Sequence, residues 1–220
     1  MVREVSSEGW EHPDTIKFYA ENRRTEAELY PSEATFFRQA VLESESMLDI
    51  GCAVGGFSAI AKSIKPSIDY LGLDRSKTAI AEAKRQFPDT AFNVMDGVRV
   101  TLPSNSFDLV VCTGVAVHER RWASLLREAY RLSKKICLFD IRLHRDPHRP
   151  GSLKIAFQGD DTGYRVPYFM VRPDIFWLEL MILNPQPTDV KMHGYIKPVS
   201  SMAVTDRTHA FMAVFELRKP

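Results

Sequence analysis

The chain has 220 residues, of which 45% are hydrophobic and 26% are charged. These proportions are those of an ordinary folded protein, and they exclude a disordered chain, a collagen-like repeat and a disulfide scaffold. The 29 Lys and Arg residues nearly balance the 28 Asp and Glu residues, so a net charge of +1 gives no overall basic field to attract nucleic acid or an anionic membrane. The length favours one domain over two, and it allows a core that needs neither disulfides nor a metal.

Cysteine placement and the length of the hydrophobic runs indicate the compartment. Cys52, Cys112 and Cys137 lie in apolar or glycine-rich runs without CxxC spacing, which predicts buried free thiols in a reducing environment. Arg3 and Glu4 stand where a signal peptide needs an apolar core. The hydrophobic runs are too short to cross a bilayer. We therefore expect a cytoplasmic protein with no membrane contact.

Residues 1–45 are polar with scattered aromatic side chains, and they are expected to form a helical arm or lid that includes a helix over 33–42. From residue 46 onward, short apolar runs alternate with amphipathic stretches, which is the pattern of strand–helix–strand units in a parallel sheet. The expected strands are 46–50, 68–73, 90–94, 107–112 and 135–141. The helices expected among them are 57–64, 77–87 and 122–132.

The chain after residue 141 departs from this alternation. Residues 142–172 begin with a basic cluster around Arg142, and a connection of this length is usually functional, so we expect it to be a substrate-specific insertion. Pro173 is expected to open a helix. The runs 189–196 and 209–217 are expected to form an antiparallel pair.

The most informative segment is LDIGCAVGG, residues 48–56, which predicts a strand, a tight glycine-rich turn and the start of a helix. Gly51 allows the sharp turn, and the glycines at the end of the segment allow a ligand to approach the backbone. Asp74 ends the second strand, where a carboxylate can accept both hydroxyls of a ribose. Asp96 and Gly97 follow the third strand, where an acid can receive an exocyclic amine. This arrangement indicates an adenosine site without a phosphate site.

These residues resemble the motifs of the class I S-adenosylmethionine-dependent methyltransferases, and the resemblance covers about residues 32–141. The family has an acidic residue followed by glycines at alternate positions. Asp49, Gly51 and Gly55 match this motif, whereas Ala53 replaces the middle glycine. The resemblance implies an α/β fold, a Rossmann-like three-layer sandwich whose mostly parallel seven-stranded sheet has a reversed last strand.

Membership of this family implies S-adenosyl-L-methionine as cofactor, S-adenosyl-L-homocysteine as product, and a methyltransferase domain over residues 46–220. The turn at 51–55 would pack against the methionine part of the cofactor, Asp74 would bind the ribose, and Asp96 would hold the adenine. The expected cofactor-binding residues are Asp49, Gly51, Cys52, Ala53, Gly55, Asp74, Arg75, Asp96, Gly97 and Thr113.

His118 follows the fourth strand and is the candidate catalytic residue. A histidine with a pKa near neutrality could take a proton from the acceptor as the methyl group arrives, and the alternative is a residue that only packs or hydrogen-bonds. No metal site is expected, because Pro147 lies between His144 and His148 and argues against a helix that presents both to an ion. A dinucleotide fingerprint would require glycine where Ala53 stands, and no P-loop occurs.

The expected function is methyl transfer to a small molecule, with oxygen, nitrogen and carbon all open as the methylated atom. Residues 113–116 lack the Asp/Asn-Pro-Pro-Tyr/Phe motif of base- and glutamine-modifying enzymes, and the near-zero charge also disfavours nucleic acid. The basic start of 142–172 leaves an anionic acceptor open beside a simple solvated loop. The alternatives are a non-catalytic methyltransferase-like partner subunit and an aminopropyl-type transferase. The sequence does not indicate the oligomeric state.

Overall fold

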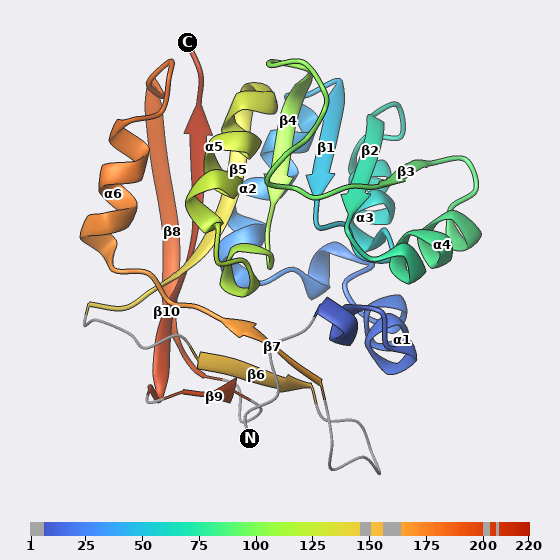
Figure 1. Ribbon diagram of the computed structural model, residues 1–220. Helices are drawn as coiled ribbons and strands as arrows, with labels where there is room; N and C mark the ends of the chain where they lie inside the picture. The colour runs from blue at the N-terminus through green and yellow to red at the C-terminus, as the bar shows by residue number, and fades with distance from the viewer. Residues whose placement is uncertain (1–6, 146–150, 156–163, 200–202, 206) are drawn as a thin grey trace.

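The computed structural model describes residues 7–145, 151–155, 164–199, 203–205 and 207–220. A seven-stranded sheet runs through the molecule in the order β3-β2-β1-β4-β5-β10-β8 (Figure 1). Its strands are β1 (Ser46–Ile50), β2 (Asp69–Asp74), β3 (Ala91–Val94), β4 (Phe107–Cys112), β5 (Ser133–Leu143), β8 (Asp189–Pro198) and β10 (His209–Arg218). The strands from β3 to β5 are parallel, and β10 is antiparallel to both β5 and β8. The predicted parallel sheet with a reversed last strand is confirmed.

Helices cover both faces of this sheet. On one face lie α2 (Pro31–Leu42), α3 (Gly56–Ile64) and α4 (Lys77–Gln86), and on the other lie α5 (Trp122–Leu132) and α6 (Pro173–Met181). Successive strand residues point to opposite faces. In β4, accordingly, Leu109 and Val111 pack with the first set of helices, whereas Val110 and Cys112 pack with the second. The result is the expected three-layer sandwich.

A second sheet was not predicted. Residues of the 142–172 segment form β6 (Gly151–Ile155) and β7 (Tyr164–Tyr168), which join β9 (Ala203–Val204) in the order β7-β6-β9. These strands are short, β7 contains a proline, and β9 has two residues, so none of them shows a usable alternation. Residues 146–150 of the predicted basic cluster, which include His148, lie outside the described residues.

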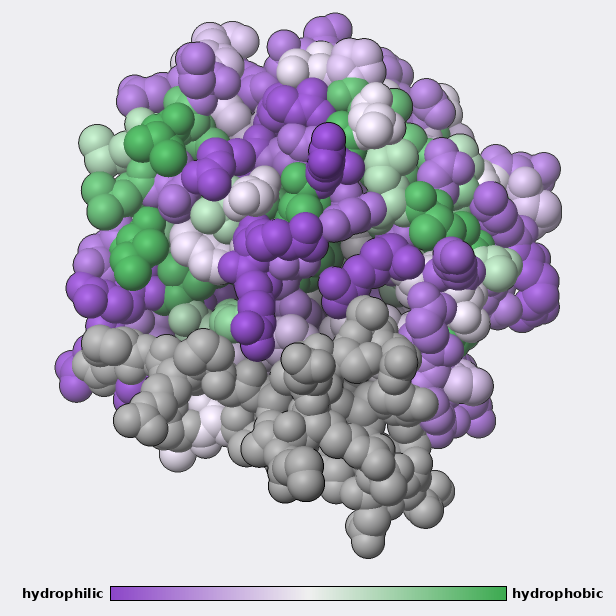
Figure 2. Space-filling model, viewed as in Figure 1, coloured by the Kyte–Doolittle hydropathy of each residue, from purple (hydrophilic) through white to green (hydrophobic). Residues whose placement is uncertain are grey.

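The surface and the cysteines complete the description. Cys52, Cys112 and Cys137 are free and buried, as predicted. Figure 2 shows hydrophobic side chains gathered over α6, where Leu178 and Met181 are 64% and 66% exposed. None of the helices in the described parts of the chain has the length and apolar character that a bilayer span requires.

Candidate active site

A cavity of about 1170 Å³, its open mouth included, lies at the carboxyl edge of the parallel strands. Open α/β sheets bind their ligands at this edge. The turns after the strands supply most of the wall, and the N-terminal segment with η1 (Ser7–Trp10) and α1 (Pro13–Glu21) supplies the cover. The predicted site residues that line the cavity are Asp49, Gly51, Cys52, Ala53, Asp74, Arg75, Asp96, Gly97, Thr113 and His118.

The turn between β1 and α3 is tied to the end of β2. The backbone N–H groups of Gly51 and Cys52 both donate to the carbonyl oxygen of Leu73, at 2.7 and 3.0 Å. Gly51 has a φ of +82°, and a Cβ atom there would lie 2.2 Å from Cγ2 of Val115, so the position requires glycine. Ala53 has a φ of 47°. The residue that replaces the motif's middle glycine therefore adopts a left-handed backbone, which an alanine tolerates at a small cost.

Gly55 differs from its predicted role. It is not among the described residues that line the cavity, and a Cβ atom on it would lie 2.6 Å from Cζ of Phe92. A Cβ atom on Gly56 would lie 2.4 Å from the carbonyl oxygen of Arg23. These two glycines therefore allow the protein's own segments to pack closely, and the role of Gly55 in cofactor binding stays a prediction.

Asp74 supports the same turn from the end of β2. One carboxylate oxygen accepts the N–H of Ala53 at 2.9 Å, and the other accepts the N–H of Ser76 at 2.8 Å. Burial raises the pKa of Asp74 above its usual value, although both hydrogen bonds act to lower it. Each oxygen keeps a further lone pair, so the group can still accept hydrogen bonds from hydroxyls in the cavity.

Asp49 lies deeper, and only 3% of the residue is exposed. The hydroxyl of Tyr70 donates to its carboxylate at 2.6 Å. Burial raises the pKa of Asp49 to about 7, although the Tyr70 hydrogen bond lowers it. A cationic group in the cavity would favour the ionised carboxylate, so Asp49 is suited to hold one. Burial also raises the pKa of the neighbouring Cys52 thiol well above its usual value, so this thiol stays protonated at neutral pH.

Asp96 and Arg75 belong to a charged network at the rim of the cavity. Arg121 Nη2 donates to Asp96 at 3.0 Å and to Glu119 at 3.1 Å, and Arg75 Nη1 lies 3.8 Å from the Glu119 carboxylate. The other Asp96 oxygen accepts the N–H of Val98 at 3.2 Å. Sequence reasoning missed Arg121 and Glu119, because nothing local in the sequence connects them to Asp96.

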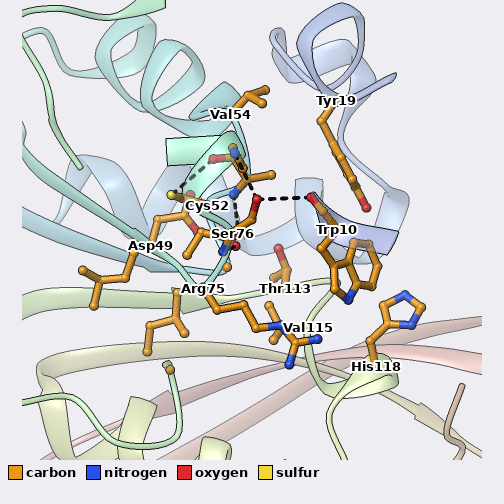
Figure 3. Close-up of a pocket in the computed structure, with 18 of the residues that line it drawn as sticks. Trp10, Tyr19, Asp49, Cys52, Val54, Arg75, Ser76, Thr113, Val115 and His118 are labelled. Carbon is orange, nitrogen blue, oxygen red and sulfur yellow. Dashed lines mark hydrogen bonds between the residues drawn. The ribbon is translucent and has the colours of Figure 1, made fainter. Parts of the chain in front are cut away.

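The N-terminal segment is fastened to the start of α4 (Figure 3). Ser76 Oγ donates to the carbonyl oxygen of Trp10 at 3.1 Å, and the Glu11 carboxylate accepts the N–H groups of Lys77 and Thr78, both at 3.0 Å. A carboxylate at a helix N-terminus satisfies free N–H groups and interacts well with the helix dipole. This contact joins residues more than sixty positions apart, so it places Trp10 over the cavity without leaving a local signal.

Arg23 closes the cover from its other end. Its Nη2 lies 2.6 Å from both carboxylate oxygens of Glu33, and its guanidinium lies 4.9 Å from the centre of the Phe57 ring. Arg23 and Tyr19 both line the cavity. Of the arm expected over residues 1–45, residues 10–23 therefore line the cavity as a cover, whereas α2 packs on the sheet, and we retain the lid role as a proposal.

His118 lies in η3 (Ala116–His118), just past β4, as the sequence suggested. Its Nδ1 is 2.7 Å from the carbonyl oxygen of Pro167, and its ring lies 4.9 Å from the Trp10 ring (Figure 3). Burial lowers the pKa of His118 to about 3, although the Pro167 hydrogen bond raises it. The ring is therefore neutral at physiological pH. Because a carbonyl oxygen only accepts, Nδ1 carries the proton and Nε2 has the free lone pair.

Comparison with known proteins finds similarity to methyltransferases over the central part of the chain. Residues 48–138 match the family model described as a methyltransferase domain. This segment spans the β1 turn, Asp74, Asp96 and His118. The central part of the chain is therefore similar to a methyltransferase domain. A trans-aconitate 2-methyltransferase from Methylobacterium nodulans is 30% identical over 130 residues, which are 59% of this chain and 48% of that protein. The Escherichia coli protein of the same name is 30% identical over 101 residues, 46% of this chain and 37% of its own length.

Solved structures share the fold of this chain. The N-terminal domain of EvdMO1, crystallised with S-adenosylhomocysteine and D-fucose, has a TM-score of 0.60 and 16% identity, and the match covers 86% of this chain and 84% of that one. A methyltransferase from Methanosarcina mazei has a TM-score of 0.58 and 15% identity, covering 86% and 98%. The chain spans about half or less of the length of the curated relatives it matches, whereas it spans most of these structures.

Proposed function

We propose that this chain binds S-adenosylmethionine in the cavity at the carboxyl edge of the sheet and transfers its methyl group to a small-molecule acceptor. The observation that carries the proposal is the pair of acidic side chains Asp49 and Asp74, which line the cavity on either side of the glycine turn. The methyltransferase family match and two relatives named for methylating a small tricarboxylic acid support it.

The residues present fit this cofactor. Asp74 retains acceptor capacity after its two backbone hydrogen bonds, which suits the two hydroxyls of a ribose. Asp49 is buried beside the turn and suits the cationic amino group of the methionine part. Asp96 lines the same cavity beyond β3, where it would receive the adenine amine, and its exposed carboxylate keeps acceptor capacity beside Arg121.

The main contribution of the chain to this reaction would be the alignment of the two reactants. When bound, S-adenosylmethionine supplies a methyl group on a sulfonium, from which it leaves readily. An acceptor electron pair would form the new bond to this carbon, and the sulfur of S-adenosylhomocysteine would keep the electron pair of the broken bond. The cover formed by Trp10 and Tyr19 would exclude water and hold the two partners in line, which is the main source of acceleration in such a displacement.

His118 is the residue we propose for the acceptor's proton. Its neutral ring exposes no charge that would repel a sulfonium, and Nε2 is the unprotonated nitrogen. A buried imidazole with a low pKa is a weak base, so this role applies to an acceptor that loses its proton as the bond to carbon forms. For a carboxylate acceptor, which carries no proton, His118 would serve only as a wall of the site.

The test is formation of S-adenosylhomocysteine from S-adenosylmethionine, measured by mass spectrometry against a panel of small hydroxyl, amine and carboxylate compounds that includes trans-aconitate. We expect turnover with at least one member and a product heavier by one methyl group. Release of methylthioadenosine from decarboxylated S-adenosylmethionine, tested as a second donor, would instead show aminopropyl-type transfer. Tight binding of S-adenosylhomocysteine without turnover on any acceptor would favour the non-catalytic partner subunit.

A further inference from the structure

A second cavity lies beside the first, between the main sheet and the three-stranded sheet. It measures about 770 Å³ with its open mouth included. Its described lining comes from the start of α2 and from β5, β7, β8 and β10, through Tyr30, Arg142, Tyr168, Lys197, Ala210 and Met212. These residues include two cations and two tyrosine rings, and none of the described lining residues is acidic. The cavity is therefore positively charged with aromatic walls.

Arg142 is the central cation of this cavity. Its guanidinium lies 4.9 Å from the centre of the Tyr168 ring, and its Nε is buried without a hydrogen-bond partner. Among the residues that the structure describes, no carboxylate lies within ion-pair distance of it. Asp140, two positions earlier on β5, interacts with its charge but uses one oxygen to accept the N–H of Gly114. By contrast, Arg23 is paired with the Glu33 carboxylate through its Nη2.

Lys197 adds a second charge at the mouth. It is exposed, and its Nζ lies 4.9 Å from the centre of the Tyr30 ring. A buried donor with no acceptor carries a desolvation cost that a bound anion removes. The Arg142 guanidinium, which has the Tyr168 ring against it, carries parallel N–H groups that match the two oxygens of a carboxylate.

The second cavity is one residue layer away from the proposed methyl-transfer site. Tyr168 lines it, and the same ring lies 6.3 Å from the ring of His118, which lines the first cavity. Strand β7 is fixed against η3 by two hydrogen bonds, between Pro167 and His118 and from the N–H of Phe169 to the carbonyl oxygen of Val117. The rings of Tyr168 and His118 therefore separate the two cavities, and a small molecule held at Arg142 lies one side chain away from the first cavity.

We propose that the second cavity holds a carboxylate of the methyl acceptor, with Arg142 as the binding residue and Lys197 as a source of long-range attraction. The inference rests on the proposed function, since it assigns the acceptor class of the same site. The acceptor is then a small carboxylic acid whose apolar part lies between Tyr30 and Tyr168. The 142–172 segment contributes through β7, which places Tyr168 against the guanidinium.

The experiment uses the full chain saturated with S-adenosylhomocysteine and titrates it by calorimetry with trans-aconitate, glutarate and inorganic phosphate, with the neutral methyl esters of the two acids as controls. We expect at least one free acid to bind and its ester not to bind. Arg142→Gln should weaken the acid by about 10–150-fold, the range of a lost hydrogen bond to a charged group. Lys197→Gln should weaken it less, by about 2–5-fold, and the loss should shrink as salt is added.

The matched control is Arg172→Gln, which removes an arginine just after β7 whose charge is already paired with Asp174. It should leave acid binding unchanged. All three variants should keep the wild-type affinity for S-adenosylhomocysteine. The carboxylate site would be overturned if the acids fail to bind, bind no better than their esters, or bind Arg142→Gln as tightly as the wild type. Binding of phosphate alone would indicate a phosphate site instead. A wild type that does not bind S-adenosylhomocysteine would instead overturn the proposed function. If Arg142→Gln fails to fold, the exposed Lys197→Gln variant with its salt dependence decides the question.

Discussion

Replacing His118 by Asn should change how the stability of the protein depends on pH. In the wild type, burial lowers the pKa of His118 from 6.5 to about 3, against the opposing hydrogen bond to Pro167. Between these two values the unfolded chain binds more protons than the folded chain, so the free energy of unfolding rises with pH. An asparagine amide places an N–H close to the position of Nδ1 and does not titrate. The variant should therefore lack this contribution.

The size of the effect follows from the two pKa values. A pH of about 5 is about 1.5 units below the pKa of the unfolded histidine, so the unfolded state binds a proton that the folded state does not. This lowers the free energy of unfolding of the wild type by about 2 kcal/mol at about pH 5 and by almost nothing at about pH 7. Burial also raises the pKa of Asp49 to about 7 and that of Asp140 to about 6. These carboxyls hold protons in the folded state and act in the opposite direction, but they are present in both proteins and cancel in the difference.

Urea unfolding of the wild type and of His118→Asn at about pH 5 and about pH 7 measures this difference. We expect the wild type to lose about 2 kcal/mol relative to the variant on going to the lower pH. The same difference at both pH values would show that the folded ring is hydrated or charged, and would refute the reasoning from burial. The sequence alone suggested a titration near neutrality. The structure places the pKa of His118 at about 3, so the rate of wild-type turnover should not change with pH through this histidine between about pH 6 and pH 9.

Three further predictions follow from the walls of the first cavity. Gly51→Ala should lower the free energy of unfolding in urea by about 2–5 kcal/mol, because strain at positive φ adds to the clash with Val115. Gly114→Ala is the control, with a similar φ and no atom within 4 Å of the added Cβ, and it should cost only about 1–2 kcal/mol. Equal losses in the two variants would rule out the clash. Binding of S-adenosylhomocysteine near pH 6 should release protons as Asp49 ionises beside the cationic amino group, and the affinity should rise with pH up to about 7. Calorimetry in two buffers of different ionisation enthalpy measures this proton release, and Asp49→Asn should show none. Glu11→Ala should cost about 1 kcal/mol and weaken cofactor binding, because it unfastens the cover from α4; unchanged affinity would mean that the cover does not contribute.

The order of the main elements could be predicted because their signals are local. Strands β1, β2 and β4 have continuous apolar runs that end in an acid or in a turn, and each of the helices between them has one apolar stripe. It was also predictable that residues at the strand ends, such as Asp74 and Asp96, would line one cavity, since topology brings the carboxyl ends of parallel strands together. Ala53 adopts a left-handed backbone at a position where the motif has glycine, so a match by residue type alone misses this part of the turn.

What could not be predicted depends on contacts between distant segments. Glu11 caps a helix more than sixty residues away, Arg121 reaches Asp96, and β7 packs behind His118. The close approach of the Phe92 ring to Gly55 was not predictable either. Each of these depends on packing that no local pattern records.

Calorimetric titration of the wild type and of Asp74→Ala with S-adenosylhomocysteine and with NAD tests the central claim most directly. The wild type should bind S-adenosylhomocysteine and not NAD. Asp74→Ala should weaken that binding by about 1.5–3 kcal/mol, or about 10–150-fold, while circular dichroism shows a folded chain. A wild type that binds NAD in preference, or a folded Asp74→Ala variant with unchanged affinity for S-adenosylhomocysteine, would contradict the assignment of this cavity.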